Sequence, residues 1–387
     1  MENSSAGLTK ADAADILHEV LKFRETELDS MKEIKRLSLA FTYVGCFLGA
    51  GFVSGQELWQ FFGSFGNWGY LGFVVAAALF VTFGVLLVRI TQMSGIDEMD
   101  RVLVPWNIPW LRKATGVIEA LFLLGVVIIM TAGVGAMLNQ LLNIPTWLGD
   151  GLFAAVVALI AILGVSGMVS AFSALVPMLV VATLLFAVAA FCRFGVGDVL
   201  TLEMVNTNPL MPNWFVAALT YVAYNMLGAI GIVTPVGKLV EKKSTVFSGM
   251  AIAGLMLMGV AGSILTSLAV FRPAAQAELP MVALATELSS FLGGCYGVLL
   301  LFGMFCNALA SLVALVVYLE HKWEMLKPRR KPLLAVLAVL VWLGSLGGFG
   351  DLIGVIFPVF GYISIFYLGC LVVHYVQCCR REKEKTV

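Results

Sequence analysis

A carboxylate stands inside one of the most apolar parts of this chain, next to residues that tend to interrupt helices. Glu57 follows the glycine-rich stretch GAGFVSG of residues 49–55. An ionisable side chain within a membrane segment is by default a candidate for function, because its burial in hydrocarbon is costly. Glu57 is therefore a candidate to bind a coupling ion or to carry a proton. The alternative is a structural carboxylate that reaches the outer interface or pairs with a polar neighbour.

The sequence around this carboxylate occurs a second time. Residues 42–51 read TYVGCFLGAG and residues 220–231 read TYVAYNMLGAIG, and the second copy lies in the sixth predicted span, five spans after the first. This odd number makes the second copy enter the membrane from the opposite face, as in an inverted repeat. Glycines in both copies predict paired helix breaks, which line the substrate site in many transporters. Close packing of small residues between helices is the alternative explanation.

An interrupted helix offers two kinds of polar group to a ligand. Its free N–H groups favour an anion and its free carbonyls favour a cation, so a zwitterion is able to use both. We expect a substrate carboxylate at the N–H groups of residues 50–54 and an ammonium group or sodium ion at the carbonyls. Asn307 and Ser311, four residues apart, suit an oxygen-lined cation site or, equally, hydrogen bonds between helices.

Several other classes of chemistry have no support in the sequence. Its 24 basic and 24 acidic residues leave no net charge to attract nucleic acid. The cysteines form no CxxC or Cys/His pattern, so neither a disulfide framework nor a zinc site is expected. Residues 348–351 match the GxGD pattern of intramembrane aspartyl proteases, but no second aspartate is expected in a span to share the acid and base roles. We therefore expect no enzyme.

The composition of the chain predicts that membrane-spanning helices position these candidate site residues. Hydrophobic residues make up 60% of the 387-residue chain and charged residues 12%, whereas a soluble domain is about 25% charged. A bilayer core is crossed by about 20 apolar helical residues. Ten such runs predict an all-α integral membrane protein. The runs are residues 37–62, 69–92, 115–142, 146–165, 167–192, 214–238, 245–270, 291–320, 331–348 and 352–376.

Positive charges give the orientation of these spans. With the N-terminus in the cytoplasm, the predicted cytoplasmic segments hold every lysine and arginine except Arg193 and Arg272. Residues 36–200 then form the first repeat of five spans and residues 201–377 the second. Residues 1–35 carry apolar side chains at helical spacing among charges, which predicts a cytoplasmic amphipathic segment. Residues 378–387 are predicted to be a cytoplasmic tail.

Residues 36–377 resemble the YkvI-type amino-acid permease family of the amino acid–polyamine–organocation (APC) superfamily. The most specific element is GAGFVSGQE at residues 49–57. The resemblance implies the five-plus-five inverted-repeat fold of the leucine transporter type, with helices 1 and 6 discontinuous. It implies a substrate site formed by two groups of residues, which are Gly49, Ala50, Gly51, Phe52 and Ser54 from the first span, and Tyr221, Tyr224, Asn225 and Gly228 from the sixth.

The resemblance also bears on the coupling ion. It implies a sodium site made of first-span carbonyls and eighth-span hydroxyls, with Ser311 supplying one oxygen, and the other candidates for ion coupling are Glu57 and Asn307. Some sodium-independent relatives place a lysine in the fifth span, and this fifth span has none. Sodium and a proton therefore both stay open as the coupling ion, with Glu57 as the proton candidate.

These features predict a secondary active transporter, a cation-coupled symporter of amino acids or similar small zwitterions that works by alternating access. The alternative is a transporter-like membrane sensor that binds a small ligand without moving it. The expected partners are a small-molecule substrate, with an amino acid favoured, and the lipid bilayer. No cofactor is expected beyond Na⁺ or H⁺. The expected location is the plasma membrane with both termini in the cytoplasm, and the sequence points to no particular oligomeric state.

Overall fold

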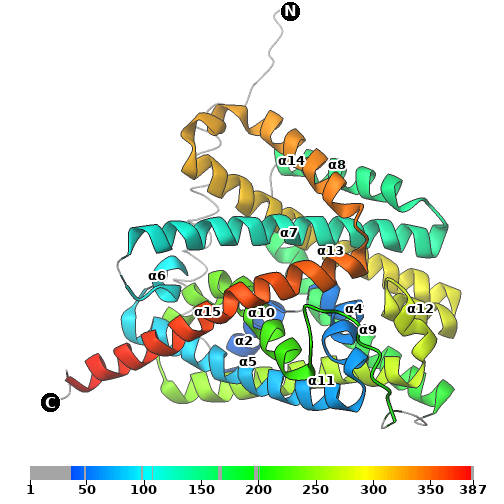
Figure 1. The fold of residues 1–387 in the computed structure, drawn as a ribbon, viewed down its shortest axis with the longest axis horizontal. Coiled ribbons are helices and arrows are strands. Elements are labelled where there is room, and N and C mark those ends of the chain that lie inside the picture. The colour runs from blue at the N-terminus through cyan, green and yellow to red at the C-terminus, as the bar shows by residue number, and fades with distance from the viewer. Residues whose placement is uncertain are drawn as a thin grey trace, which may run out of the picture.

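The apolar runs of the sequence fold as helices (Figure 1), because backbone polar groups in hydrocarbon must bond within their own segment. The computed structural model describes residues 36–384 apart from residues 48, 97–98, 107, 164–167, 196–198 and 200. The predicted amphipathic segment of residues 1–35 lies outside the described residues. The helices are α2 (Arg36–Gly45), α3 (Ala50–Val53), α4 (Gln56–Phe61), α5 (Asn67–Ser94), α6 (Met99–Leu103), α7 (Pro109–Leu142), α8 (Thr146–Leu163), α9 (Met168–Phe194), α10 (Trp214–Lys238), α11 (Lys243–Val270), α12 (Pro280–Leu288), α13 (Ser290–Lys322), α14 (Arg330–Ser345) and α15 (Phe349–Glu384).

Helix length and hydropathy agree with the predicted spans. Among the described residues, α5, α7, α11, α13 and α15 are long and apolar enough to cross a membrane. Shorter apolar stretches lie within α8, α9 and α10. The first predicted span is divided among α2, α3 and α4, and the ninth is α14. The last helix continues to Glu384, so most of the predicted tail is an extension of α15.

The helical passes form two groups, and each group contains passes from both repeats. The first two passes of each repeat, α2–α5 and α10–α11, pack on one another. The third and fourth passes, α7, α8, α13 and α14, form the second group, with α8 and α14 at the top of Figure 1. The fifth passes, α9 and α15, each touch both groups. This five-plus-five arrangement places the first span beside the sixth.

The first span is broken, as the sequence predicts. Gly55, between α3 and α4, has a φ of 84°, in the left-handed region that favours glycine. The Tyr296 hydroxyl donates to Val53 O at 2.8 Å, and Met281 N donates to Ser54 O at 2.9 Å. Remote segments therefore satisfy carbonyls that the break removes from the helical ladder.

The predicted break in the sixth span is wrong, because α10 is continuous from Trp214 to Lys238 through Gly228 and Gly231. A glycine costs a helix about 1 kcal/mol relative to alanine but does not by itself open the hydrogen-bond ladder. Among the described contacts, side chains that reach α10 carbonyls come from α10 itself, such as Asn225 Nδ2 to Tyr221 O. A break here would leave buried carbonyls without the remote donors that serve the first span.

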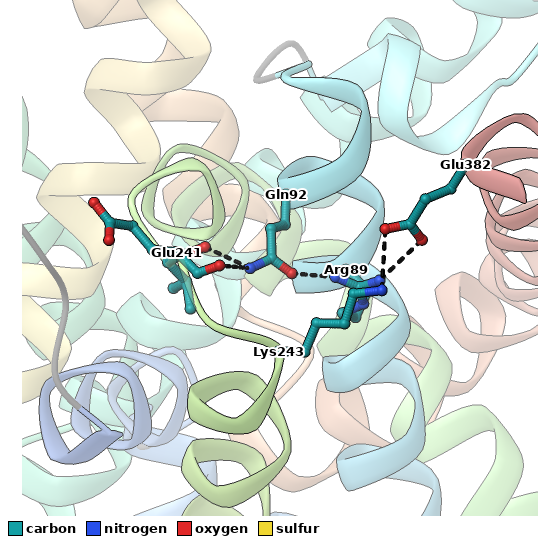
Figure 2. Close-up of polar contacts among 6 residues, drawn as sticks. Arg89, Gln92, Glu241, Lys243 and Glu382 are labelled. Atoms are coloured by element: carbon teal, nitrogen blue, oxygen red, sulfur yellow. Dashed lines mark hydrogen bonds and ion pairs between the residues drawn. The ribbon is translucent and has the colours of Figure 1, made fainter. Parts of the chain in front are cut away.

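A polar network joins three helix ends on the side predicted to be cytoplasmic (Figure 2). Arg89 of α5 is buried, and it donates to Gln92 one turn later. Gln92 Nε2 donates to two carbonyls in the link between α10 and α11, at 2.6 and 2.9 Å. Glu382 near the end of α15 pairs with Arg89 at 3.4 Å and with Lys243 of α11 at 3.0 Å. The network therefore ties α5, α11 and α15 together.

Candidate substrate site

The carboxylate of Glu57 lies at the break of the first span. Glu57 is the second residue of α4 and is 5% exposed. A Cβ atom on Gly51 would lie 2.5 Å from Glu57 Oε2, so glycine leaves the room that the carboxylate occupies. From α10, the Tyr224 hydroxyl donates to Glu57 Oε1. The first and sixth spans thus meet at one buried carboxylate.

Aromatic rings hold the tyrosine side of this contact. Tyr224 stacks on Phe357 of α15, with ring centroids 4.5 Å apart and planes 9° from parallel. Tyr221 packs edge-on against Tyr224 at 5.7 Å. Phe61 of α4 lies 5.2 Å from Tyr221 and 5.7 Å from Tyr224. Packing on several sides therefore fixes the Tyr224 hydroxyl against Glu57, and Tyr221 belongs to the same aromatic cluster.

In the described part of the chain, no ion pair with a basic side chain includes Glu57. Its described hydrogen-bond donor is a neutral hydroxyl. The neighbouring spans hold no lysine, arginine or histidine over residues 37–88, 114–142, 214–237 and 290–320. A buried carboxylate without an opposite charge is stable either as the protonated acid or with a bound cation.

Beside the carboxylate, the predicted site keeps an accessible polar edge. Gly49 is half-buried, and a Cβ atom on it would lie 3.4 Å from Asn307 Nδ2 of α13. Asn225 is half-buried, and Gly228 is exposed one turn later on α10. A Cβ atom on Gly228 would lie 3.4 Å from the Phe122 ring of α7. Backbone and amide groups of the break are therefore within reach of a small solute.

Three other residues of the predicted substrate and ion sites, Phe52, Ser54 and Ser311, are buried. The Ser54 side chain is buried, and its hydroxyl donates to Gly51 O at 3.0 Å, within the break. Phe52 is also buried, and Ala50 is the first residue of α3. Ser311 is buried one turn beyond the asparagine of α13. In this structure the Ser54 hydroxyl therefore bonds within the break.

On the side of the break away from α2, Gln60 and Glu278 bond to the backbone at the start of α15. Gln60 Nε2 donates to Gly350 O at 2.7 Å, and Glu278 Oε2 accepts from Gly350 N at 2.6 Å. A pocket of about 430 Å³ lies nearby, with lining residues from α7, the start of α8, residues 277–278 and α12. Its lining includes the carboxylates of Glu278 and Glu287. This opening is acidic and lies at the predicted outer face.

Asp150 is a buried acid that the sequence did not single out. It is 2% exposed in α8, and a Cβ atom on Gly135 of α7 would lie 1.8 Å from Asp150 Oδ1. The available signal was a charge one turn inside the apolar run 146–165. The expectation of no second aspartate in a span is therefore wrong. Asp351 is exposed at the start of α15, however, so the two aspartates share no buried site.

Comparisons with known sequences place the chain among membrane proteins. No protein-family model matches it. It is 25% identical over 338 residues to the uncharacterized membrane protein YkvI of Bacillus subtilis (strain 168). It is 29% identical over 342 residues to the uncharacterized protein YyaD of the same organism. Each match covers 86% of this chain and 94% of the relative.

Solved structures share the fold at low sequence identity. MhsT in complex with L-phenylalanine matches with a TM-score of 0.56 and 18% identity, over 89% of this chain and 88% of MhsT. A variant of the Eremococcus coleocola manganese transporter matches with a TM-score of 0.53 and 16% identity, over 86% and 78%. A nucleobase-cation-symport-1 family transporter with bromovinylhydantoin bound matches with a TM-score of 0.52 and 18% identity, over 81% and 72%. The chain is therefore a multi-pass membrane protein with the inverted-repeat fold of leucine-transporter-type proteins.

Proposed function

We propose that this chain is a secondary active transporter of small amine-bearing solutes, amino acids and similar zwitterions among them, coupled to a cation. The observation that carries the proposal is Glu57, a buried carboxylate at a helix break that has no opposite charge in the described structure. It joins the first span to Tyr224 of the sixth. Binding of a positive group at this junction is able to favour one arrangement of the helices over another.

The contacts around the break support alternating access, because they differ on its two sides. On the predicted outer side, Met281 N bonds to Ser54 O and Glu278 bonds to the start of α15. On the other side, α2 packs mainly on α11 of its own helix group. Gly45 at the end of α2 is half-buried, and no described atom of another segment lies within 4 Å of its Cβ position. The two sides of the break are therefore held by different contacts, as alternating access requires.

Two coupling ions fit the proposal. Glu57 is the proton candidate, because a proton neutralises the buried carboxylate. A sodium ion near Ser311 is the second candidate, since Asn307 on the same helix faces Gly49 at the break. Amide, hydroxyl and carbonyl oxygens are ligands that suit a hard cation. The two candidates differ in whether a pH gradient or a sodium gradient drives uptake.

The relatives support the class of activity rather than one substrate. Two of the similar structures are named as transporters, and the third, MhsT, has L-phenylalanine bound. We base membership of the amino acid–polyamine–organocation superfamily on residues 49–57. We base a plasma-membrane location with both termini in the cytoplasm on the distribution of lysine and arginine.

Uptake into proteoliposomes tests the proposal. Purified protein is reconstituted, and labelled amino acids and amines are supplied under an imposed sodium gradient or pH gradient. We expect accumulation above equilibrium under one of the gradients, and an altered pH or cation dependence in Glu57→Gln. Saturable binding without uptake under either gradient would indicate the membrane sensor instead. An unaltered dependence in Glu57→Gln would return Glu57 to a structural role.

A further inference from the structure

We propose that the site recognises a cationic amine without a neighbouring carboxylate, and that Glu57 is the counter-ion of the ammonium group. This inference rests on the proposed function and narrows its substrate class. It replaces the expectation that an α-amino acid places its own carboxylate at the first-span break.

A carboxylate of the protein already occupies this part of the break. Glu57 Oε2 lies where a side chain on Gly51 would begin, 2.5 Å from the position of its Cβ atom. Within the same turn, Val53 N bonds to Gly49 O at 3.1 Å. The N–H groups of residues 50–54 were the expected place for the substrate carboxylate. A second carboxylate here would be placed next to the first, and like charges at short range repel each other.

The named stretches of the spans around the break offer no basic side chain to receive a substrate carboxylate. The spans that meet around the break lack lysine, arginine and histidine over residues 37–88, 114–142, 214–237 and 290–320. The accessible polar groups at its edge include the amides of Asn225 and Asn307, which carry no charge. The opposite charge for Glu57 must therefore come from the ligand or from the coupling ion.

The apolar part of the ligand has a place beside the Phe122 ring of α7. Gly228 is exposed, and its missing side chain leaves space beside the ring of Phe122. Phe122 packs edge-on against Phe360 of α15, with centroids 5.3 Å apart, so the ring is held in place. An aromatic face also attracts cations. A primary amine with a small apolar or aromatic group meets both features, with its ammonium toward Glu57 and its carbon skeleton toward Phe122.

The outer pocket agrees with this charge preference. Glu278 and Glu287 both line the pocket of about 430 Å³. A cleft lined with charges of one sign raises the local concentration of the opposite ion. Cationic solutes are therefore favoured on the predicted outer face as well as at the break.

The test uses ligand pairs that differ only in the carboxylate. Thermal unfolding of the full-length protein in detergent is measured with phenylalanine and phenylethylamine, and with leucine and isoamylamine. Phenylalanine methyl ester, in which the carboxylate is masked, is measured beside phenylalanine and phenylethylamine. We expect the amines and the ester to stabilise the protein at about tenfold lower concentration than the amino acids.

A variant assigns the effect to Glu57. Glu57→Gln keeps the size of the side chain and is expected to lose the stabilisation by amines. Glu324→Gln removes an exposed carboxylate that pairs with Lys327 and is the matched control, with the stabilisation retained. The comparison of ligands on the unaltered protein does not depend on the folding of any variant.

The outcomes separate this inference from the proposed function. Amino acids that stabilise the protein as well as their amines would overturn the inference and leave amino-acid transport in place. Stabilisation by amines that persists in Glu57→Gln would overturn the assignment of the counter-ion. If no member of either pair stabilises the protein, the inference fails, and uptake in proteoliposomes decides the proposed function separately.

Discussion

At the scale of single residues, Gly51 and Glu57 depend on each other. A methyl group on Gly51 would lie 2.5 Å from Glu57 Oε2, closer than real Cβ contacts. In Gly51→Ala the carboxylate must therefore move away from the break and from its bond to Tyr224. We expect amine binding to weaken about tenfold or more while the protein still folds, since one methyl group adds little volume. Equilibrium binding and thermal unfolding measure the two effects.

The control for this substitution is another glycine in a membrane helix. In the part of the chain that the structure describes, no atom of another segment lies within 4 Å of the Cβ position of Gly259 in α11, so Gly259→Ala meets open space. We expect Gly259→Ala to bind as the unaltered protein does. Unchanged binding in Gly51→Ala would show that the position of the Glu57 carboxylate does not matter for the ligand.

Tyr224 allows the hydrogen bond to be separated from the ring packing. Tyr224→Phe keeps the stack on Phe357 but removes the hydroxyl that donates to Glu57. Loss of a donor to a buried acceptor costs about 1–3 kcal/mol, so we expect a lower unfolding temperature and weaker amine binding. Tyr70→Phe is the control, because the Tyr70 hydroxyl has no hydrogen-bond partner among the described residues. Equal effects of the two substitutions would contradict the role of Tyr224.

At the scale of helices, the sequence predicts which segments cross the membrane but only one of the two breaks. Glycines mark both the first and the sixth spans, and the two copies differ little in local sequence. The difference lies in remote partners, since Tyr296 and Met281 bond to carbonyls of the first break. Those partners are more than 200 residues away in sequence, and no local pattern indicates them. For the same reason Glu57 was predictable as a candidate, and its contact with Tyr224, 167 residues away, was not.

Tyr296 provides a test of how the broken span is stabilised. Its hydroxyl donates to Val53 O at 2.8 Å and lies 3.2 Å from the Thr183 hydroxyl. Tyr296→Phe leaves a buried carbonyl without this donor, and we expect the free energy of unfolding to fall by about 1–3 kcal/mol. Tyr362→Phe is the control, because it removes a tyrosine hydroxyl bond to a carbonyl at an exposed position. A loss in Tyr296→Phe no larger than in the control would mean that the break is stabilised by other contacts.

At the scale of the whole molecule, two helix groups meet at the break while α9 and α15 touch both. Each end of α15 makes polar contacts, with Glu278 at Gly350 N on one side and with Arg89 and Lys243 through Glu382 on the other. The two sets of contacts lie on the two predicted faces of the membrane. Movement of the groups during transport must therefore change the surroundings of α15 at one end or the other.

The ion pairs of Glu382 depend on its charge, so a change of pH is expected to alter the contacts at the end of α15. Hydrogen bonding from Lys243, together with the nearby charges of Lys243 and Arg89, lowers the pKa of Glu382 below its usual value. A lowered pKa in the folded protein means that the contact stabilises the structure above the ordinary carboxyl pKa of about 4.3. That stabilisation is lost as the pH falls through the lowered value. We therefore expect the end of α15 to detach from α5 and α11 only in acid, and earlier at high salt, because exposed charges are screened.

A pair of spin labels, on the end of α15 and on the start of α11, measures this detachment as an increase in distance. Glu382→Gln removes both ion pairs and is expected to give the detached distance at neutral pH, whereas Glu384→Gln, two residues further along the same helix, is expected to leave it unchanged. Ligand uptake measured on the same variants connects the contact to transport. If the labels stay close together in Glu382→Gln, the helix packing of α15 and not this network holds the predicted cytoplasmic side together.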